Sequence, residues 1–503
     1  MQLNREEYLS KVAGCWMGKN IGGTVGAPFE WLRQVNDISF YTQELKGEPL
    51  PNDDLDIQLL WLIAMEREGV RLNAGLLGEY WLNYVAPHWA EYGNGKINMR
   101  NGLVPPLSGT VNNTFKDSCG SFIRSEIWAC VCPGAPERAA KYALEDSAID
   151  HGNGEGTFAE VFTVVLESAA FVEKDIRKLI NIGLSFIPED CAVAGAVRLA
   201  VDCHDKGLPW QEARDEILKH YRGMAPFGSR EHISAADVEK GFFDGVLGFD
   251  VPSNMGILII GLLYGENDFG KTLCIAVNCG EDTDCTAATA GSILGIMNGI
   301  DYIPEEWIQP IGRSIKTLVL NLGDLYGVPK DIDDLTNRTL ALAYKVIDAF
   351  NLPVKLSDGE TDLSGDLQSV LANGKEQLYS NLGRAVFTFD IAEVAVDYSC
   401  DPYIGENESK TVTLTITNRF GSQHNFNMKV YTDEGVTANP RYGQVYIGTY
   451  ANDCCKAVSV TFTAETLRQS TRAVVELTIP GRHSALLVPI VLLNGAYKNT
   501  NLS

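Results

Sequence analysis

The sequence predicts a mainly α-helical protein followed by a small all-β sandwich. From residue 5 to about residue 350, apolar residues recur at intervals of three and four, the period of amphipathic helices. After Asn351 the pattern changes to short stretches of alternating apolar and polar residues separated by turn residues, which is typical of antiparallel strands. At 503 residues the chain is too long for one hydrophobic core, so more than one domain is expected.

The first domain is predicted to be an orthogonal all-α body covering residues 1–350. Its clearest helical stretches are 59–68, 139–149, 158–171 and 335–350. Connectors rich in Gly, Asn and Pro separate such stretches, and we expect these loops to carry the chemistry. The expected loops are 22–28, 92–106 and 152–156.

Residues 351–384 are predicted to be a polar linker with a short helix, and residues 385–503 an immunoglobulin-like sandwich. The expected strands are 385–396, 411–417, 425–431, 458–464, 472–479 and 485–493. No cluster of reactive side chains stands out among them, so an accessory or interface role is expected for this domain.

Composition excludes some functions. The formal net charge is −24, and no Lys/Arg run stands out, so no nucleic-acid partner is expected. The apolar stretch 255–264 is too short to span a bilayer, and the polar N-terminus lacks a signal-peptide pattern, so a cytoplasmic protein is expected. The twelve cysteines lack paired CxxC spacing and are expected to be reduced, mostly buried thiols.

Two acidic clusters stand out. Asn52-Asp53-Asp54-Leu55-Asp56 opens one predicted helix, and Glu281-Asp282-Thr283-Asp284-Cys285 opens another that continues from Thr286 to Gly295. Helix capping explains one such cluster on its own, because Asn and Asp are favoured at helix N-termini. Two clusters of mutually repelling carboxylates instead favour a site for Mg²⁺, which prefers carboxylate oxygens. Small residues such as Ala287 and Gly291 would let the second helix pack closely in the body.

Three motifs resemble those of the ADP-ribosylglycohydrolase family, which includes glycohydrolases that activate dinitrogenase reductase. Residues 14–30, Gly-Cys-Trp-Met-Gly-Lys-Asn-Ile-Gly-Gly-Thr-Val-Gly-Ala-Pro-Phe-Glu, are similar to the family's Gly-rich first helix and loop. Asn52-Asp53-Asp54 resembles its Thr-Asp-Asp element, and Asp282-Thr283-Asp284-Cys285 its Asp-x-Asp-Thr/Ser element. Two weaker matches are the small-residue loop at 120–124 and Asp150-His151. The resemblance covers about residues 5 to 350.

The resemblance implies a hydrolase with two Mg²⁺ ions, Mn²⁺ being the alternative, that cleaves an N- or O-glycosidic bond to ADP-ribose. The implied metal ligands are Asn52, Asp53, Asp54, Asp282, Asp284 and Cys285. Glu30, Asp53 and Asp284 are the implied catalytic residues, Glu30 as general acid or base. Gly120, Ser121 and His151 are implied to bind the substrate; structural roles for Glu30 and His151 remain the competing interpretation.

The departures from the family pattern concern the ligands. Asn52 stands where the family usually has Thr, and Gly23 where it often has Asp. Cys285 replaces a Thr/Ser hydroxyl, and a soft thiol is a poor Mg²⁺ ligand, so the second metal comes into question. These differences put the leaving group and the specificity for ADP-ribose in question, rather than the fold.

Alternative functions stay open at this point. One is a glycoside or nucleoside hydrolase that acts on another furanosyl substrate, and another is an ADP-ribose-binding protein without turnover. An isoprenoid-type enzyme is disfavoured because its aspartates recur along one helix face. Aromatic residues near the loops could stack on adenine, although core packing is their commoner role; they are Trp89, Tyr92, Phe115 and Phe122. The expected partner is a small-molecule or ADP-ribosylated substrate, with no membrane partner, and the oligomeric state stays open.

Overall fold

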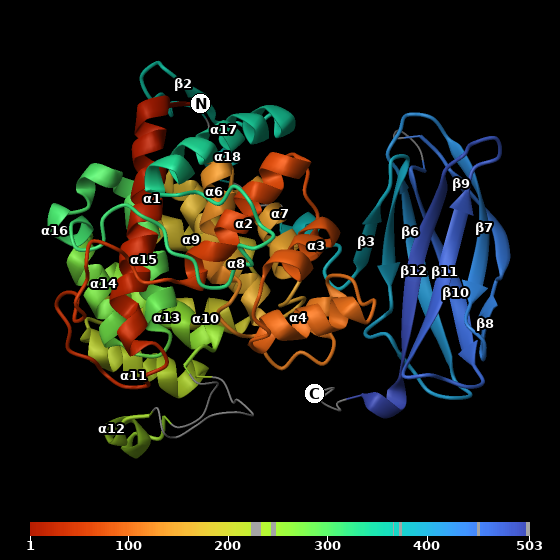
Figure 1. Cartoon of the computed structure of the whole chain (residues 1–503), viewed down its shortest axis with the longest axis horizontal. Helices are drawn as coiled ribbons and strands as arrows, with labels where there is room; N and C mark the ends of the chain where they lie inside the picture. Colours follow the sequence, from red (N-terminus) through yellow and green to blue (C-terminus); the bar gives the residue numbers. More distant parts are fainter. Residues whose placement is uncertain (223–232, 243–247, 366, 372–374, 450–452, 499–503) are drawn as a thin grey trace. The chain divides into compact units, whose positions relative to one another are not determined.

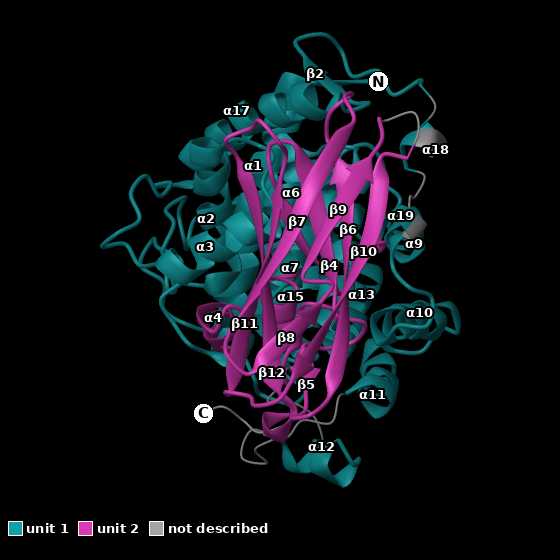
Figure 2. Ribbon diagram, turned by 90° about the vertical axis from the view of Figure 1, so that its right-hand side faces the viewer, with its two compact units in different colours: residues 1–92, 115–147, 154–378 teal, residues 93–114, 148–153, 379–503 magenta. Residues whose placement is uncertain are grey.

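The computed structural model describes residues 1–222, 233–242, 248–365, 367–371, 375–449 and 453–498. Residue 366 and residues 372–374 of the predicted linker therefore lie outside the described residues. The described chain forms two compact units (Figure 2). The first comprises residues 1–92, 115–147 and 154–378, and the second residues 93–114, 148–153 and 379–503. The predicted boundaries at 350 and 384 stay predictions.

The first unit is built of helices (Figure 1). The longer ones are α1 (Arg5–Gly26), α2 (Asp53–Glu68), α3 (Ala74–Tyr84), α7 (Pro136–Ser147), α8 (Glu155–Ala170), α9 (Ile176–Phe186), α10 (Ala192–Asp205), α11 (Trp210–Tyr221), α13 (Val251–Tyr264), α14 (Phe269–Asn278), α15 (Thr283–Asn298) and α17 (Ile332–Phe350). Short helices are η1 (Ala27–Phe29), η2 (Phe122–Arg124), α6 (Glu126–Val131), α12 (Ala235–Glu239), η4 (Ile300–Tyr302), α16 (Glu305–Ile308), α18 (Leu367–Val370) and α19 (Lys375–Leu378). Helix α4 (Ala90–Arg100) begins in this unit and continues into the second.

Helices α1 and α15 lie side by side in the first unit (Figure 1), and most residues of both are buried. Glycines on both helices bring the two backbones together: a Cβ atom on Gly18 would lie 2.1 Å from the carbonyl oxygen of Gly291, and one on Gly295 would lie 2.1 Å from that of Gly14. Only glycine permits this approach. The small-residue run of α15 therefore does what the sequence predicted, and it places the acidic N-terminus of α15 deep in the unit.

The three predicted loops are each wrong in part, the loop at 152–156 only at its end, where Glu155 and Gly156 begin α8. Residues 22–26 continue α1, because their glycines face α15 rather than interrupt the helix; a Cβ atom on Gly22 would lie 2.2 Å from the carbonyl oxygen of Ala287. Residues 92–100 belong to α4 despite their Gly and Asn content. The predicted linker also contains an unpredicted strand, β2 (Lys355–Ser357), which pairs in parallel with β1 (Gln2–Asn4).

The second unit contains a sandwich of two five-stranded sheets (Figure 2, magenta). One sheet has the order β3-β4-β6-β10-β8 and the other β5-β12-β11-β7-β9. The strands are β3 (Ala385–Thr388), β4 (Ala392–Asp397), β5 (Tyr403–Ile404), β6 (Ser409–Asn418), β7 (His424–Thr432), β8 (Val436–Asn439), β9 (Tyr442–Ile447), β10 (Cys455–Ala464), β11 (Ser470–Thr478) and β12 (Ala485–Asn494), with η5 (Gly495–Tyr497) after them.

The predicted strand 385–396 is wrong as one element. It is a hairpin of β3 and β4, in which the Phe389 amide bonds the carbonyl of Ala392 across the turn. The core of the sandwich also takes in Leu103, Leu107 and Val111, which lie in or next to helix α5 (Leu107–Thr110). An insertion from the helical part of the sequence thus completes this core.

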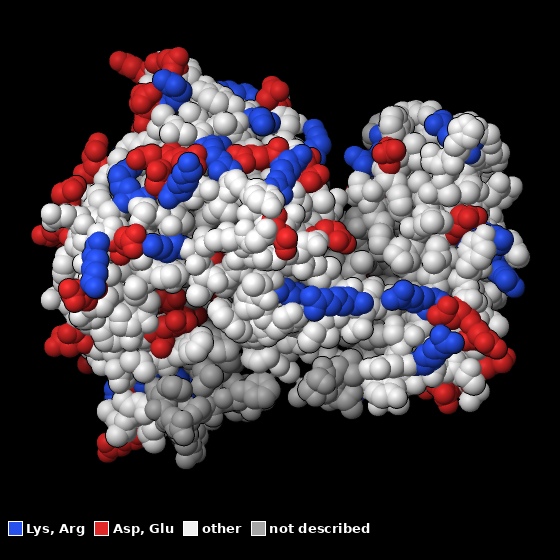
Figure 3. Space-filling model, viewed as in Figure 1, with Lys and Arg blue, Asp and Glu red and all other residues white. Residues whose placement is uncertain are grey.

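Charged side chains of both signs are mixed on the surface (Figure 3), and most of the cysteines are buried. On the face shown in Figure 3, acidic and basic side chains are interspersed. The twelve cysteines are free, and nine of them are buried. Among the described helices, none is long and apolar enough to cross a membrane.

Candidate active site

The first acidic cluster lies at the N-terminus of α2. Asn52 is the N-cap, and its Oδ1 accepts a hydrogen bond of 2.8 Å from the Asp54 amide. Its Nδ2 faces Asp284 Oδ2 at 3.4 Å, so the Asn52 amide joins the two acidic clusters. A Cβ atom on Gly23 would lie 2.3 Å from Asn52 Nδ2. Two of the three departures from the family pattern, Asn52 and Gly23, are therefore spatially coupled: the Asn52 amide fills the space that a side chain at position 23 would need.

The second acidic cluster lies at the N-terminus of α15, which begins three residues earlier than predicted. Asp282 is the N-cap, yet its side chain makes no capping hydrogen bond. Its backbone amide instead donates to Asn254 Oδ1 at 3.1 Å, which anchors this turn to α13. Oδ1 of the Asp282 carboxylate has no hydrogen-bond partner among the described residues, so this oxygen is available for a ligand.

Glu30 is held near α15 by its neighbours in the chain. The Trp31 amide donates to the Glu281 carbonyl at 2.9 Å, and the Glu281 amide to the Leu32 carbonyl at 3.3 Å. Gly280 has a positive φ of 77°, and a Cβ atom there would lie 2.2 Å from the carbonyl oxygen of Gln34. Glycine at this position thus allows the two loops to meet, and the meeting brings Glu30 to the second acidic cluster.

The two loops and α2 gather acidic ligands into two overlapping groups. Ligand atoms of Asp54, Asp284 and Cys285 lie within 4.8 Å of one another, and so do those of Glu30, Asp282 and Asp284. Both oxygens of Asp54, which is 1% exposed, have no hydrogen-bond partner among the described residues. The same holds for Oδ1 of Asp282 and Oδ1 of Asp284. Buried carboxylate oxygens without partners are costly unless a cation balances them.

The pKa values reflect this crowding. Burial, and then the charge of Asp284, raise the pKa of Glu30 to about 10 and that of Asp53 to about 6. Burial also raises the pKa values of Asp54 and Asp282 well above the ordinary range. Opposing this, Lys19 stabilises the charged form of Asp54. Lys19 is buried on α1, with its Nζ 2.7 Å from Glu126 Oε1.

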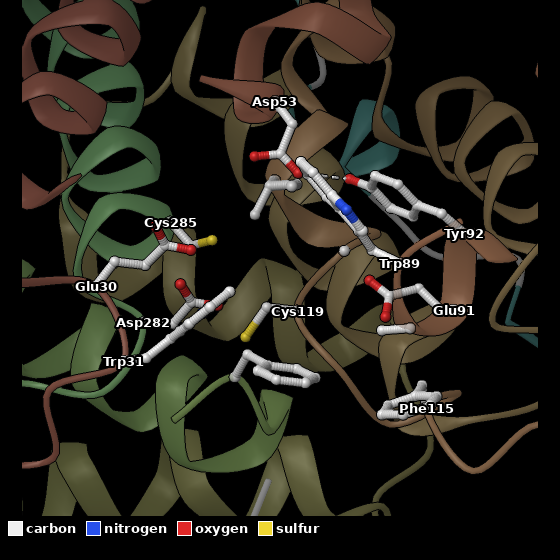
Figure 4. Close-up of a pocket in the computed structure, with 14 residues that line it drawn as sticks. Glu30, Trp31, Asp53, Trp89, Glu91, Tyr92, Phe115, Cys119, Asp282 and Cys285 are labelled. Carbon is white, nitrogen blue, oxygen red and sulfur yellow. Dashed lines mark hydrogen bonds between the residues drawn. The ribbon is translucent and has the colours of Figure 1, made fainter. Parts of the chain in front are cut away.

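A cavity of about 370 Å³ opens beside these carboxylates. Figure 4 shows Glu30, Asp282 and Cys285 near one another, while Asp53 lies on another side of the cavity together with Tyr92. The Tyr92 hydroxyl donates to Asp53 Oδ2 at 3.0 Å. Asp53 belongs to neither ligand group, so its role as a metal ligand stays a prediction.

Aromatic rings form much of the cavity wall. Of the four aromatic candidates, Trp89, Tyr92 and Phe115 line the cavity, and Phe122 is fully buried. Sequence reasoning missed Trp31, Glu91, Cys119 and Phe249, which also line it. Trp31, Glu91 and Cys119 each adjoin a residue that the sequence had singled out, namely Glu30, Tyr92 and Gly120, and this proximity was their signal. Phe249 comes from a distant segment of the chain, and no motif in the sequence pointed to it.

The predicted substrate-binding residues have different surroundings. Gly120 lines the cavity. Ser121 is fully buried, and its hydroxyl donates to the Gly156 carbonyl at 2.7 Å, so it supports the start of α8. His151 belongs to the second unit, where its Nδ1 lies 2.8 Å from Asp150 Oδ1. Substrate contact by Ser121 and His151 stays a prediction.

Comparison with known proteins identifies the family of the chain. A model of the ADP-ribosylglycohydrolase family matches residues 4–345, and the chain belongs to this family. The ADP-ribosylarginine hydrolase Tri1 of Pseudomonas putida (strain GB-1) is 31% identical over 75 residues, which are 14% of this chain and 20% of that relative. The match therefore spans about one fifth of the relative's length. The predicted family and the mainly α fold with its β domain are confirmed.

Among solved structures, the crystal structure of a FixG-related protein from Vibrio parahaemolyticus shares 13% identity with this chain. The alignment covers 21% of this chain and 99% of that one, with a TM-score of 0.18.

Proposed function

We propose that the protein is a hydrolase of N- or O-glycosidic bonds to ADP-ribose, dependent on two divalent cations, Mg²⁺ or alternatively Mn²⁺. The observation that carries the proposal is the convergence of buried carboxylates from α2 and α15 beside an aromatic cavity, with several of their oxygens lacking a hydrogen-bond partner among the described residues. Membership of the ADP-ribosylglycohydrolase family supports the type of bond.

The residues present fit a divalent cation. Two ligands of one ion, each about 2.0–2.4 Å from it, lie no more than about 4.8 Å apart. Both ligand groups meet this limit. Asp54, Asp282 and Asp284 would hold the cations, and the oxygens that lack hydrogen-bond partners are the ones a cation would satisfy. When bound, such ions supply Lewis acidity and lower the pKa of water.

The chain's own residues supply orientation and proton transfer. Hydrolysis breaks the bond between the anomeric carbon and the leaving nitrogen or oxygen, forms a bond from that carbon to a water oxygen, and moves one proton from the water to the leaving atom. Glu30 faces the cavity, and we assign its carboxyl group this proton transfer. Trp31, Trp89 and Phe115 would stack on the base and exclude water.

A second candidate is a hydrolase of uncharged furanosyl compounds such as nucleosides. Among the described residues, no Lys, Arg or His lines the cavity, while Glu30, Asp53, Glu91 and Asp282 do. A diphosphate is recognised mainly by cationic side chains, helix N-termini or metals. An aromatic and acidic wall suits a neutral or cationic glycoside better than a diphosphate, unless the bound cations contact the diphosphate.

The test is isothermal titration of Mg²⁺, and then of ADP-ribose, into metal-stripped protein, beside the Asp282→Asn variant. We expect Mg²⁺ to bind the wild type, ADP-ribose to bind only when Mg²⁺ is present, and the variant to lose both. Metal binding without ADP-ribose binding would favour the second candidate, with nucleosides as the next ligands. Absence of any divalent-cation binding would reject the mechanism. A cytoplasmic location stays a prediction, and the oligomeric state stays open.

A further inference from the structure

The two ligand groups differ in chemical hardness. The group of Glu30, Asp282 and Asp284 offers only carboxylate oxygens, the ligands that suit Mg²⁺ and Mn²⁺. The group of Asp54, Asp284 and Cys285 offers a sulfur as well, and sulfur favours thiophilic ions such as Zn²⁺ or Co²⁺. Asp284 belongs to both groups, so one carboxylate could bridge two different ions.

We propose that the centre is heterometallic: a hard cation lies beside Glu30 and Asp282, a thiophilic divalent cation lies between Asp54 and Cys285, and Asp284 bridges the two. This proposal rests on the proposed function, because it concerns the same centre. It deepens that function by assigning a different class of metal ion to each half.

Burial and contacts support a true ligand site around Cys285. Asp54 is 1% exposed, and both of its oxygens lack hydrogen-bond partners among the described residues. Its oxygen, the Asp284 oxygen and the Cys285 sulfur lie within 4.8 Å of one another, which suits ligands of a single ion. Cys285 is also buried, so bulk water competes poorly for the ion.

Binding of the thiophilic ion has a defined proton balance. The S–H bond of Cys285 breaks, a bond between sulfur and the metal ion forms, and the proton passes to solvent. Neither oxidant nor reductant is needed. The thiolate also brings a negative charge to the centre, which with Asp54 and Asp284 balances two divalent cations better than a hydroxyl would.

A second thiol provides a matched control. Cys119 lines the same cavity but belongs to neither ligand group. Cys119→Ser and Cys285→Ser make the same change, of sulfur to oxygen, at two buried positions. Only the change at Cys285 should alter a metal–sulfur bond.

The experiment adds Co²⁺ to metal-stripped full-length protein already saturated with Mg²⁺ and records the near-ultraviolet absorption. We expect a sulfur-to-cobalt charge-transfer band, one Co²⁺ per chain by elemental analysis, and loss of the band on adding Zn²⁺ but not further Mg²⁺. Cys119→Ser should keep the band. Cys285→Ser and Asp54→Asn should lose it while still binding Mg²⁺ in calorimetry, and this retained Mg²⁺ binding also shows that the variants fold.

Three results would overturn the proposal. If the wild type binds Mg²⁺ at both positions and shows no charge-transfer band, the thiol is not a ligand, although the proposed function stands. A band that survives in Cys285→Ser and disappears in Cys119→Ser places the sulfur ligand elsewhere. Binding of neither Co²⁺ nor Mg²⁺ removes the centre altogether, and the proposed function with it.

Discussion

Glu30 is a cavity carboxyl whose ionisation is strongly perturbed by its surroundings. Burial, and then the charges of Asp284 and Asp53, raise its pKa to about 10, so without a cation it holds its proton at neutral pH. Glutamine has the same shape and an oxygen ligand but cannot transfer a proton. We therefore expect Glu30→Gln to lower kcat by roughly 10²–10⁴-fold while Mg²⁺ affinity stays within about tenfold. Steady-state kinetics on the glycoside identified by titration, with calorimetry of Mg²⁺, measure both; equal loss of Mg²⁺ binding would make Glu30 a ligand instead.

The buried side chain of Lys11, which is not part of the candidate active site, is expected to make the stability of the fold depend on pH. It is buried on α1, and its Nζ donates to the carbonyls of Ile296 and Met297 at 2.9 and 3.1 Å, near the end of α15. Burial lowers its pKa to about 8 from the ordinary 10.5. Between these values the unfolded chain binds more protons than the folded one, so the free energy of unfolding rises as pH increases from 8 to 10.5.

This dependence can be isolated by removing the charge. We expect the free energy of unfolding to rise by about 1–3 kcal/mol more in the wild type than in Lys11→Met over this pH interval. Urea denaturation at several pH values, followed by circular dichroism, gives the difference between the two proteins. Parallel pH profiles would show that Lys11 keeps its ordinary pKa.

At the scale of elements, the contact between α1 and α15 positions the candidate active site. It depends on glycines whose Cβ atoms would collide with backbone, as at Gly18, where the nearest atom would be 2.1 Å away. The sequence revealed the small residues of α15, but it suggested a loop at 22–28, of which residues 22–26 belong to α1. A glycine that ends a helix cannot be distinguished, in a single sequence, from a glycine that allows two helices to pack closely. The partner helix α15 is far from α1 along the chain, so the local sequence does not reveal the contact.

Gly18→Ala tests this contact. We expect the variant to lose about 2–3 kcal/mol of unfolding free energy, because backbone atoms cannot yield as a flexible side chain would. Gly421→Ala is the control: a Cβ atom there would have open space, and a change within about 0.5 kcal/mol is expected. Denaturation midpoints of both variants measure the effect, and equal stability of the two would mean that the helices separate at little cost.

At the scale of the whole molecule, the division into units departs from the order of the sequence. Residues 93–114 belong with the sandwich, and Leu103, Leu107 and Val111 are buried in its core. Helix periodicity could not reveal this, since an apolar helix face does not say which partner covers it. Five of the longer sandwich strands, β6, β7, β10, β11 and β12, were predictable because alternation of apolar residues is a local property. The shorter strands β5, β8 and β9 were not predicted.

A truncation tests this core. Removing residues 385–503 should leave the side chains of Leu103, Leu107 and Val111 without their cover, so fragment 1–384 is expected to bind a hydrophobic dye and to aggregate. In the full-length chain, Leu107→Ala should lower the stability of the second unit by about 2–4 kcal/mol. A soluble fragment that does not bind the dye would show that the apolar side chains of residues 93–114 are buried by other parts of the chain.

The sequence by itself determined the family, the mainly helical body, the strand-rich C-terminal part and the acidic clusters at two helix starts. These features depend on residues within a few positions of one another, where periodicity and helix-start chemistry are encoded. Only the tertiary structure decided that Glu30 joins Asp282 and Asp284, that Cys285 shares a ligand group with Asp54, and that aromatic rings wall the cavity. Those juxtapositions arise when helices and loops from distant parts of the chain pack together, and packing is a property of the folded molecule as a whole.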